Sequence, residues 1–514
     1  MPLERLKNKI EEFVDEHLPN KPPKRKNRNK IIHECIWGTQ LFYENEIILL
    51  DTPLLQRLRR IHQTGFAYYT FPTAVHSRFD HTLGTVTQCS RLAKELQTKQ
   101  ETKQGTLMKD LLIPLRLSAL LHDCGHGIFS HTSEELYGLL DEMQEATKEG
   151  AEFGDGPKPH EILSSLIVQS EPFKDYIEKV IPDCDTKQIS EYITGIADNS
   201  SKYKAEILCS IFDGDKIDYI HRDAHFSGLP LKIDLDRLWY GIDIMKIPID
   251  GVEYQKLSIS HSATEPLEQM MFHRTMLFPT LYQHQKVRAC DCMFKGIVEY
   301  IRNTGLGVRM GHRTVTFNNI EDFLWGTDDE FFAIGLDSKD TNLRRLMNNL
   351  LERRLFHRVL AISSRTIDDP DGHGYADLMK YRDETSPESY RHLRSLAEEI
   401  CREAVKKGLG VLPEQIWIDL PEDVKAGRDA EEAFVHIVQD ESLNKYGFIP
   451  AMKIFPIDRW VRQIEMYKWQ GSVFAPPEIQ EEIAPIAQQV IENRFGFRFK
   501  PQAFTECHLV PPNK

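Results

Sequence analysis

A short stretch that follows an apolar run concentrates side chains able to bind a metal ion. The ten residues HDCGHGIFSH, 122–131, hold three histidines and one aspartate, and they begin with the adjacent pair His122 and Asp123. Imidazole and carboxylate ligands together suit a borderline or hard divalent cation such as Fe, Mn, Zn, Co or Ni. A doublet supplies two ligands, so a complete site needs others from elsewhere in the chain.

Two further segments offer those ligands. HSRFDH ends at His81, and DGDKIDYIHRD, residues 213–223, contributes several aspartates. Because helical residues four apart share one face, Asp215, Tyr219 and Asp223 would line one wall of a pocket. The chain therefore offers a histidine, a His-Asp doublet and an aspartate, in that order.

The hydrophobic pattern predicts the elements that position these residues. Helices are indicated over residues 82–96 and 111–122, and residues 160–225 are mostly helical in pattern. A longer helical stretch, 265–303, is expected to kink at Pro279, which lacks a backbone N–H. We expect the candidate ligands at or near the ends of such helices.

The flanking segments have a different character. Residues 1–20 are predicted to form a short amphipathic helix before a basic linker, and residues 31–50 to form two short strands with a turn near Asn45. A helix is expected over residues 51–65 with Asp51 as its N-cap. Strand-like runs between helices after residue 378 indicate a smaller α+β lobe.

Composition narrows the class of protein. The 514 residues are 41% hydrophobic, which is enough for a sizeable core. No apolar run reaches the roughly 18 residues of a membrane span, and the N-terminus lacks signal-peptide features, so we expect a cytoplasmic protein without a membrane partner. Nine cysteines without a CxxC pair indicate reduced thiols. The net charge of −14 disfavours, without excluding, a nucleic-acid partner.

The ordered ligand set resembles that of the HD-domain metal-dependent phosphohydrolases. On this resemblance the metal ligands are His81, His122, Asp123 and Asp215. Asp213 and Asp218 are rivals for the last place. The family pattern favours Asp215, because a lysine follows it directly, a tyrosine follows four residues later and a second aspartate eight residues later.

Four longer segments narrow the resemblance. Residues 51–84, 122–131, 215–228 and 272–287 are similar to segments of the sterile-alpha-motif and HD-domain dNTP triphosphohydrolase (dGTPase-like) group, without the sterile-alpha-motif domain. The resemblance implies a mainly α fold, with an HD-domain helical catalytic core and a smaller α+β C-terminal lobe. The expected divisions are an N-terminal helix and basic linker (1–29), the HD catalytic domain (30–365) and the C-terminal α+β lobe (366–514).

The resemblance also implies a reaction. Members of the group hydrolyse a deoxynucleoside triphosphate to a deoxynucleoside and inorganic triphosphate, with a metal ion that lowers the pKa of water. The matching catalytic residues are His126 and His160, with Glu134 orienting His160 and His131 contacting the α-phosphate or the leaving oxygen. The matching substrate contacts are Arg78, Lys216 and Arg274 for the phosphates, Tyr282 and Tyr219 around the sugar, and Gln63 and Asp223 for the 3′ hydroxyl.

Regulated members bind a guanine nucleotide or dNTP, with Mg, between subunits. Matching residues here are Lys30, Asp51, Gln56 and Arg59, which implies a GTP, dGTP or dNTP activator and a homo-oligomer, a dimer of dimers. However, His33 and Glu34 stand where close relatives have Asn and Asp before Pro. An unregulated or differently activated enzyme fits the sequence as well.

Two alternatives keep part of this interpretation. An HD-type phosphodiesterase or nuclease would use the same metal site, and a nucleotide-binding regulatory protein would retain the site without turnover. The spacing of Asp215, Lys216, Tyr219 and Asp223 favours a mononucleotide over a nucleic acid. The complete ligand set disfavours a protein that has lost its activity.

Overall fold

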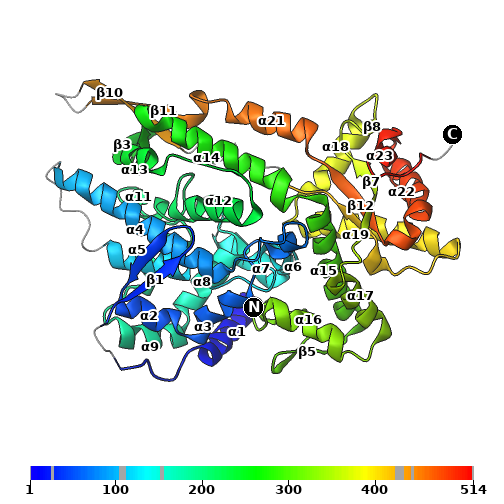
Figure 1. Cartoon of the computed structure of the whole chain (residues 1–514), viewed down its shortest axis with the longest axis horizontal. Helices are drawn as coiled ribbons and strands as arrows, with labels where there is room; N and C mark the ends of the chain where they lie inside the picture. The colour runs from blue at the N-terminus through cyan, green and yellow to red at the C-terminus, as the bar shows by residue number, and fades with distance from the viewer. Residues whose placement is uncertain are drawn as a thin grey trace.

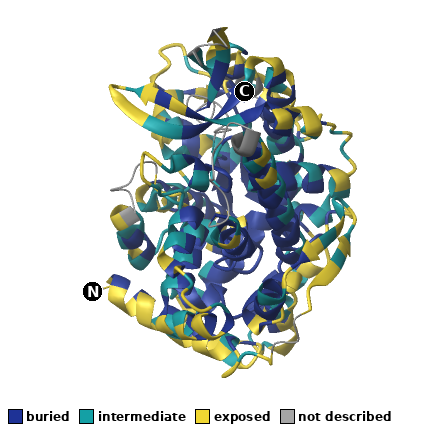
Figure 2. Cartoon of the chain, turned by 90° about the vertical axis from the view of Figure 1, so that its left-hand side faces the viewer, coloured by how far each residue is buried: buried dark blue, intermediate teal, exposed yellow. Residues whose placement is uncertain are grey.

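Helices dominate the computed structural model of this chain, and the sheets are small (Figure 1). The structure describes residues 2–24, 28–102, 111–150, 156–422, 433–440 and 445–511. The mainly α fold with an α+β C-terminal lobe is therefore confirmed. Buried residues are concentrated in the middle of the molecule (Figure 2). In the described ranges, no helix combines the length and the apolar character needed to cross a membrane.

The N-terminal segments pack onto the first core. Helix α1 (Pro2–His17) buries Leu6, Ile10 and Phe13, as its amphipathic pattern predicts. Strands β1 (Lys30–Glu34) and β2 (Gly38–Phe42) form an antiparallel hairpin. The elements that follow are α2 (Glu44–Leu50), α3 (Pro53–Gln56), and the short 3-10 turns Arg57–Arg60 and Gly65–Tyr69.

Two predictions for this region are wrong. The turn of the hairpin lies at residues 35–37 and not near Asn45, since Asn45 is in the first turn of α2. Asp51 ends α2, and Thr52 is the N-cap residue of α3. The apolar run at residues 47–50 is buried as one turn of helix, and a short apolar run does not distinguish a helix from a strand.

The predicted helices around the candidate ligands are confirmed. Helix α4 (Arg78–Thr102) packs against both α5 (Leu112–Leu121) and α12 (Gly214–Ser227). The other helices of this half are α6 (His131–Tyr137), α7 (Asp141–Gly150), α8 (Pro159–Gln169), α9 (Glu171–Val180), α10 (Thr186–Ile193), α11 (Lys202–Glu206) and α13 (Leu235–Gly241). Three separate helices therefore meet where the motifs lie.

The helical stretch that contains Pro279 is interrupted as predicted. Helix α14 (Thr264–Leu277) ends in a π-helical turn, Phe278–Tyr282, before α15 (Gln285–Thr304) begins. Proline cannot donate the helical hydrogen bond, so the backbone changes pitch there. Next in the chain come β5 (Val308–Met310), β6 (Arg313–Val315), the 3-10 turn Ile320–Phe323, α16 (Asp328–Asp337) and α17 (Thr341–Leu351).

A four-stranded sheet joins distant parts of the chain. Strands β3 (Ile242–Ile249) and β4 (Val252–Ser260) are followed in the sheet by β10 (Phe434–Asp440) and β11 (Lys445–Pro450). Strand β10 pairs in parallel with β4, so the C-terminal segment drawn in orange in Figure 1 lies beside the green β3–β4 hairpin. Helix α21 (Ile457–Tyr467) continues along α14.

A second hydrophobic core contains only residues after 358. Its sheet has the order β7 (His357–Ile362), β12 (Gly471–Ala475) and β9 (Trp417–Asp419), and α19 (Pro387–Lys406) and α22 (Gln480–Phe495) pack against it. Its smaller elements are β8 (Ile367–Asp368), β13 (Arg498–Phe499), α18 (His373–Met379) and α23 (Gln502–Thr505). The boundary at residue 365 stays a prediction. Several buried residues beyond it belong to the first core: Trp417, Ala433, Val435, Ala451, Phe455, Ile457, Val461 and Phe474.

Candidate metal centre and catalytic histidines

The structure brings the four predicted metal ligands together. His81 lies in the first turn of α4, the His122-Asp123 pair follows α5 directly, and Asp215 lies in the first turn of α12. His81 Nε2 is 3.3 Å from His122 Nε2, 2.9 Å from Asp215 Oδ1 and 3.7 Å from Asp123 Oδ2. Donor atoms of His81, His122 and Asp123 all lie within 4.8 Å of one another.

The hydrogen bonds of the two histidines show which ring nitrogens face the site. His81 Nδ1 is 2.8 Å from Asp218 Oδ2, and His122 Nδ1 is 2.8 Å from the carbonyl oxygen of Ala119. A carboxylate and a carbonyl accept hydrogen bonds, so each Nδ1 donates outward and each Nε2 faces the other ligands. Two imidazole nitrogens and two carboxylates that converge in a buried space are a donor set that fits a divalent cation.

The three aspartates that compete for the last ligand position, Asp213, Asp215 and Asp218, have different surroundings. Asp213 caps the helix, accepting from the Lys216 backbone N–H at 2.6 Å and from Lys216 Nζ at 2.9 Å. Asp218 lies behind His81 and accepts two hydrogen bonds from Arg222. Asp215 faces His81 Nε2 and His122 Nε2, at 2.9 and 3.8 Å. This geometry favours Asp215 over its rivals, as the sequence pattern does.

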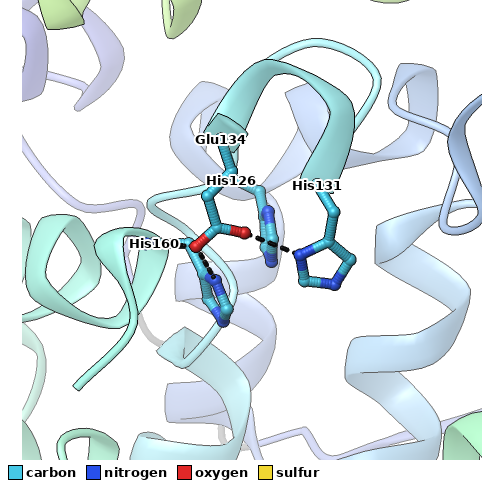
Figure 3. Close-up of side chains that lie close together, drawn as sticks. All are labelled: His126, His131, Glu134 and His160. Carbon is cyan, nitrogen blue, oxygen red and sulfur yellow. Dashed lines mark hydrogen bonds and ion pairs between the residues drawn. The ribbon is translucent and has the colours of Figure 1, made fainter. Parts of the chain in front are cut away.

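Three histidines and one carboxylate form a second cluster beside the first. Figure 3 shows Glu134 between two rings, with Oε1 2.8 Å from His160 Nδ1 and Oε2 2.6 Å from His131 Nδ1. The rings of His126 and His160 stack with their centroids 3.9 Å apart. His126 is fully buried, whereas the His131 side chain is 59% exposed. The exposed ring can reach a bound substrate.

Charge and burial give these groups different proton affinities. Burial by itself would lower the pKa of His160, but the Glu134 carboxylate raises it above the ordinary histidine value. Burial would likewise raise the pKa of Glu134, but the adjacent His160 and His131 hold it well below its usual range. Burial and the Arg78 guanidinium hold the pKa of His126 well below that of a free histidine. A protonated His160 beside a neutral His126 is therefore favoured.

A strained turn connects the two clusters. Phe129 and Ser130 have φ values of 53° and 54°, a left-handed backbone that costs energy for residues other than glycine. Asp328 holds this turn, since its Oδ1 accepts from the Phe129 N–H at 2.7 Å and its Oδ2 from the His62 N–H at 2.8 Å. Sequence reasoning missed Asp328, which lies about 200 residues from the turn that it holds.

Asp123 joins the two clusters. Its Oδ1 lies 3.4 Å from His126 Nε2, and its Oδ2 accepts from Arg78 Nη1 at 2.9 Å. Arg78 also donates from Nε to Ser130 Oγ at 2.9 Å, and it is 3% exposed. The predicted phosphate contact by Arg78 stays a prediction, because in this structure the guanidinium binds Asp123 and the turn.

The other predicted substrate residues lie around the same region. Tyr282 Oη donates to Asp223 Oδ2 at 2.6 Å, and His76 Nε2 lies 2.7 Å from the other oxygen of Asp223. Burial raises the pKa of the Tyr219 hydroxyl, and the nearby charges of Arg274 and Lys216 oppose that shift. The remaining members are Gln63 and Arg274, both buried, and Lys216, which pairs with Asp213. Their contacts with a substrate stay predictions.

The predicted nucleotide-binding residues form two surface pairs. Lys30 Nζ lies 3.2 Å from Asp51 Oδ2, and both side chains are more than half exposed. Arg59 Nε donates to Gln56 Oε1 at 2.9 Å. By contrast, Glu34 turns inward and binds Arg222. Nucleotide binding by the two surface pairs stays a prediction.

Comparisons with known proteins agree with this arrangement. The family description HD domain matches residues 78–203, and the description HD associated region matches residues 242–494. The deoxynucleoside triphosphate triphosphohydrolase SAMHD1 of Bos taurus is 29% identical over 359 residues, and that of Homo sapiens 27% over 357 residues. Each alignment covers 64% of this chain, and 58% and 55% of the relative, so this chain spans little more than half of those proteins.

Two further similarities concern proteins without a described activity. An uncharacterized protein of Methanocaldococcus jannaschii is 25% identical over 460 residues, which cover 88% of this chain and 81% of the relative. The crystal structure of a hypothetical protein from Aquifex aeolicus matches with a TM-score of 0.60 and 20% identity, over 89% of this chain and all of that one. At that identity the match supports the fold alone.

Proposed function

This chain belongs to the HD-domain phosphohydrolases, and on that premise we propose that it hydrolyses a deoxynucleoside triphosphate to a deoxynucleoside and inorganic triphosphate. The observation that carries the proposal is the position of Asp123, which contacts both the metal-ligand cluster and the histidine cluster. A cation site and a proton-transfer site that share one residue suit hydrolysis of a phosphate ester. The activity named for the mammalian relatives supports the same substrate class.

The residues that would hold the cation are His81, His122, Asp123 and Asp215. A divalent ion bound there, whether Fe, Mn, Zn, Co or Ni, would lower the pKa of water and withdraw charge from the phosphoryl oxygens. The protein contributes by holding both Nε2 atoms toward the same point through hydrogen bonds at Nδ1. Arg78 fixes the Asp123 carboxylate beside them by a hydrogen bond.

The histidine cluster would manage the proton. Because Glu134 accepts from His160 Nδ1, the Nε2 atom of His160 is the one that can release a proton. The leaving 5′ oxygen needs such a proton when its bond to the α-phosphorus breaks. His126 would stack on His160 and fix its ring plane, and the exposed His131 would contact the α-phosphate or the leaving oxygen.

The pair of Tyr282 and Asp223 would recognise deoxyribose. A tyrosine ring held by its own hydroxyl cannot move aside for an added 2′ hydroxyl, and Asp223, together with Gln63, would accept from the 3′ hydroxyl. Lys216, Arg274 and Arg78 would attract the triphosphate, and Tyr219 would complete the wall.

We further propose that the enzyme is regulated from its surface. Lys30, Asp51, Gln56 and Arg59 are proposed to bind a GTP, dGTP or dNTP activator with Mg between subunits of a homo-oligomer. The exposed position of the Lys30–Asp51 pair supports contact with such a ligand. A dimer of dimers and a cytoplasmic location belong to the same proposal.

A product assay tests the reaction. Metal-loaded protein is incubated with each dNTP alone and then with GTP or dGTP, and products are separated by chromatography. Deoxynucleoside with inorganic triphosphate is expected, and none is expected from the double variant His122→Ala, Asp123→Ala. If every dNTP survives while wild-type protein retains metal, the proposal fails, and phosphodiester substrates come next.

A further inference from the structure

The turn of the β1–β2 hairpin reaches the layer of residues behind a metal ligand. Trp37 lies in that turn, and its indole Nε1 donates a hydrogen bond to Asp218 Oδ1. The other carboxylate oxygen, Asp218 Oδ2, lies 2.8 Å from Nδ1 of His81. A hairpin at the edge of the domain thus contacts the residue that orients His81.

Arg222 ties the same carboxylate to the hairpin a second time. Its Nε and Nη2 donate to Asp218 Oδ2 and Oδ1 at 2.8 and 2.9 Å, and its Nη2 also donates to Glu34 Oε2 at 3.1 Å. Glu34 in turn accepts the backbone N–H groups of Ile36 and Trp37. Each of these hydrogen bonds restrains the Asp218 carboxylate, directly or through its neighbour.

The packing around Asp218 leaves no room for adjustment. A Cβ atom added to Gly84 would lie 1.8 Å from Asp218 Oδ1 and 2.5 Å from Arg222 Nη2. Real Cβ contacts are never that short, so the close approach of α4 to α12 needs glycine at this position. Asp218 and Arg222 are 0% and 1% exposed. The carboxylate is therefore fixed on every side that the structure describes.

We propose that Trp37 and Glu34 are positioning residues for metal binding. By holding Asp218, they keep the proton of His81 on Nδ1 and point the lone pair of Nε2 at the other ligands. Groups that orient a metal-ligating histidine typically contribute 10–100-fold to metal affinity. The inference rests on the metal centre of the proposed function and extends it to the hairpin.

Glu34 contributes a charge to the interior of this arrangement. Its side chain binds Arg222 and the hairpin backbone, and is about 10% exposed. The Glu34 carboxylate gives the buried Arg222 guanidinium a second negatively charged acceptor. Without it, the charged partner of Arg222 would be Asp218 alone.

The experiment compares metal affinities of three single variants. Trp37→Phe removes the indole N–H but keeps an aromatic ring, and Glu34→Gln removes the charge beside Arg222. Thr39→Val is the matched control, since Thr39 lies on the same hairpin and its hydroxyl pairs with the exposed His33. The dissociation constant for Mn²⁺ is measured by equilibrium dialysis, and the thermal midpoint of the metal-free protein is recorded for each.

Weaker Mn²⁺ binding by about tenfold or more is expected for Trp37→Phe and Glu34→Gln, with the control within about twofold of wild type. In an Asp218→Asn background, Trp37→Phe should weaken Mn²⁺ binding little further, because Trp37 and Asp218 act through the same contact. Unchanged Mn²⁺ affinity in both variants overturns the inference and leaves the proposed function intact. A lower thermal midpoint without weaker Mn²⁺ binding has the same meaning. Absence of binding by wild type of Mn²⁺ and equally of Fe²⁺, Zn²⁺, Co²⁺ and Ni²⁺ overturns both the inference and the proposed function.

Discussion

Removal of the charge between the two histidines should move the pH profile of the enzyme. Glu134→Gln keeps an oxygen that can accept from His160 Nδ1 but removes the negative charge 2.8 Å from that nitrogen. A buried opposite charge at this distance raises a histidine pKa. Loss of the charge should therefore lower the pKa of His160, although the same carboxylate is shared with His131.

The sign follows from the direction of the shift. The pKa of His160 is raised in the folded protein, so its acid form persists to higher pH and is lost as the pH rises through that pKa. Without the carboxylate the acid form is lost at lower pH, so the alkaline limb of kcat/KM should move to lower pH. Well above the limb, each pH unit of that movement should lower the rate about tenfold, or about 1.4 kcal/mol.

The assay is deoxynucleoside release measured across pH for wild type, Glu134→Gln and the matched variant Glu161→Gln. Glu161 also raises the pKa of His160, but it accepts its hydrogen bond from the Lys158 backbone N–H. The other titratable groups around His160 are Lys158, His126 and His131. An alkaline limb that stays in place, or that moves equally in both variants, would refute the role given to Glu134.

Three further predictions concern the cation, the sugar and the turn. The double variant His122→Ala, Asp123→Ala should lose bound metal and turnover together, by metal analysis and product assay; turnover without metal would contradict the ligand set. Tyr282→Ala should reduce the preference of kcat/KM for dATP over ATP roughly tenfold or more, and an unchanged ratio would exclude Tyr282 from sugar selection. Asp328→Ala should lower the free energy of unfolding by about 2–4 kcal/mol in denaturant titrations, since it strips the strained turn of its acceptor; a loss below about 1 kcal/mol would contradict this.

Sequence patterns anticipated the parts of the fold that depend on local chemistry. The helices that carry His81, His122 and Asp215 were predicted from the spacing of apolar residues, and the break at Pro279 from its missing N–H. The hairpin was predicted with its turn in the wrong place. The run at residues 47–50 is apolar throughout, so it carries no periodicity that separates a buried helix from a strand.

Some residues of the site carried a signal that pattern reading did not use. Arg222 follows Asp218 by four residues, which is the spacing of an ion pair on one helix face. That spacing marked Asp218 as a structural partner more than as a metal ligand. Trp37 and Asp328 carried no such signal, because their partners lie about 180 and 200 residues away in the chain.

The sequence by itself determined the kinds of ligand, their order and the helices that hold them, because these depend on side-chain chemistry and on contacts within a few turns. Only the tertiary structure decided which oxygen and nitrogen atoms face one another. The rotation of α12 against α4 directs Asp215 toward His81 Nε2 and Asp218 toward Nδ1, and the docking of the hairpin brings Trp37 to that carboxylate. Such choices depend on packing between distant segments, which no local pattern records.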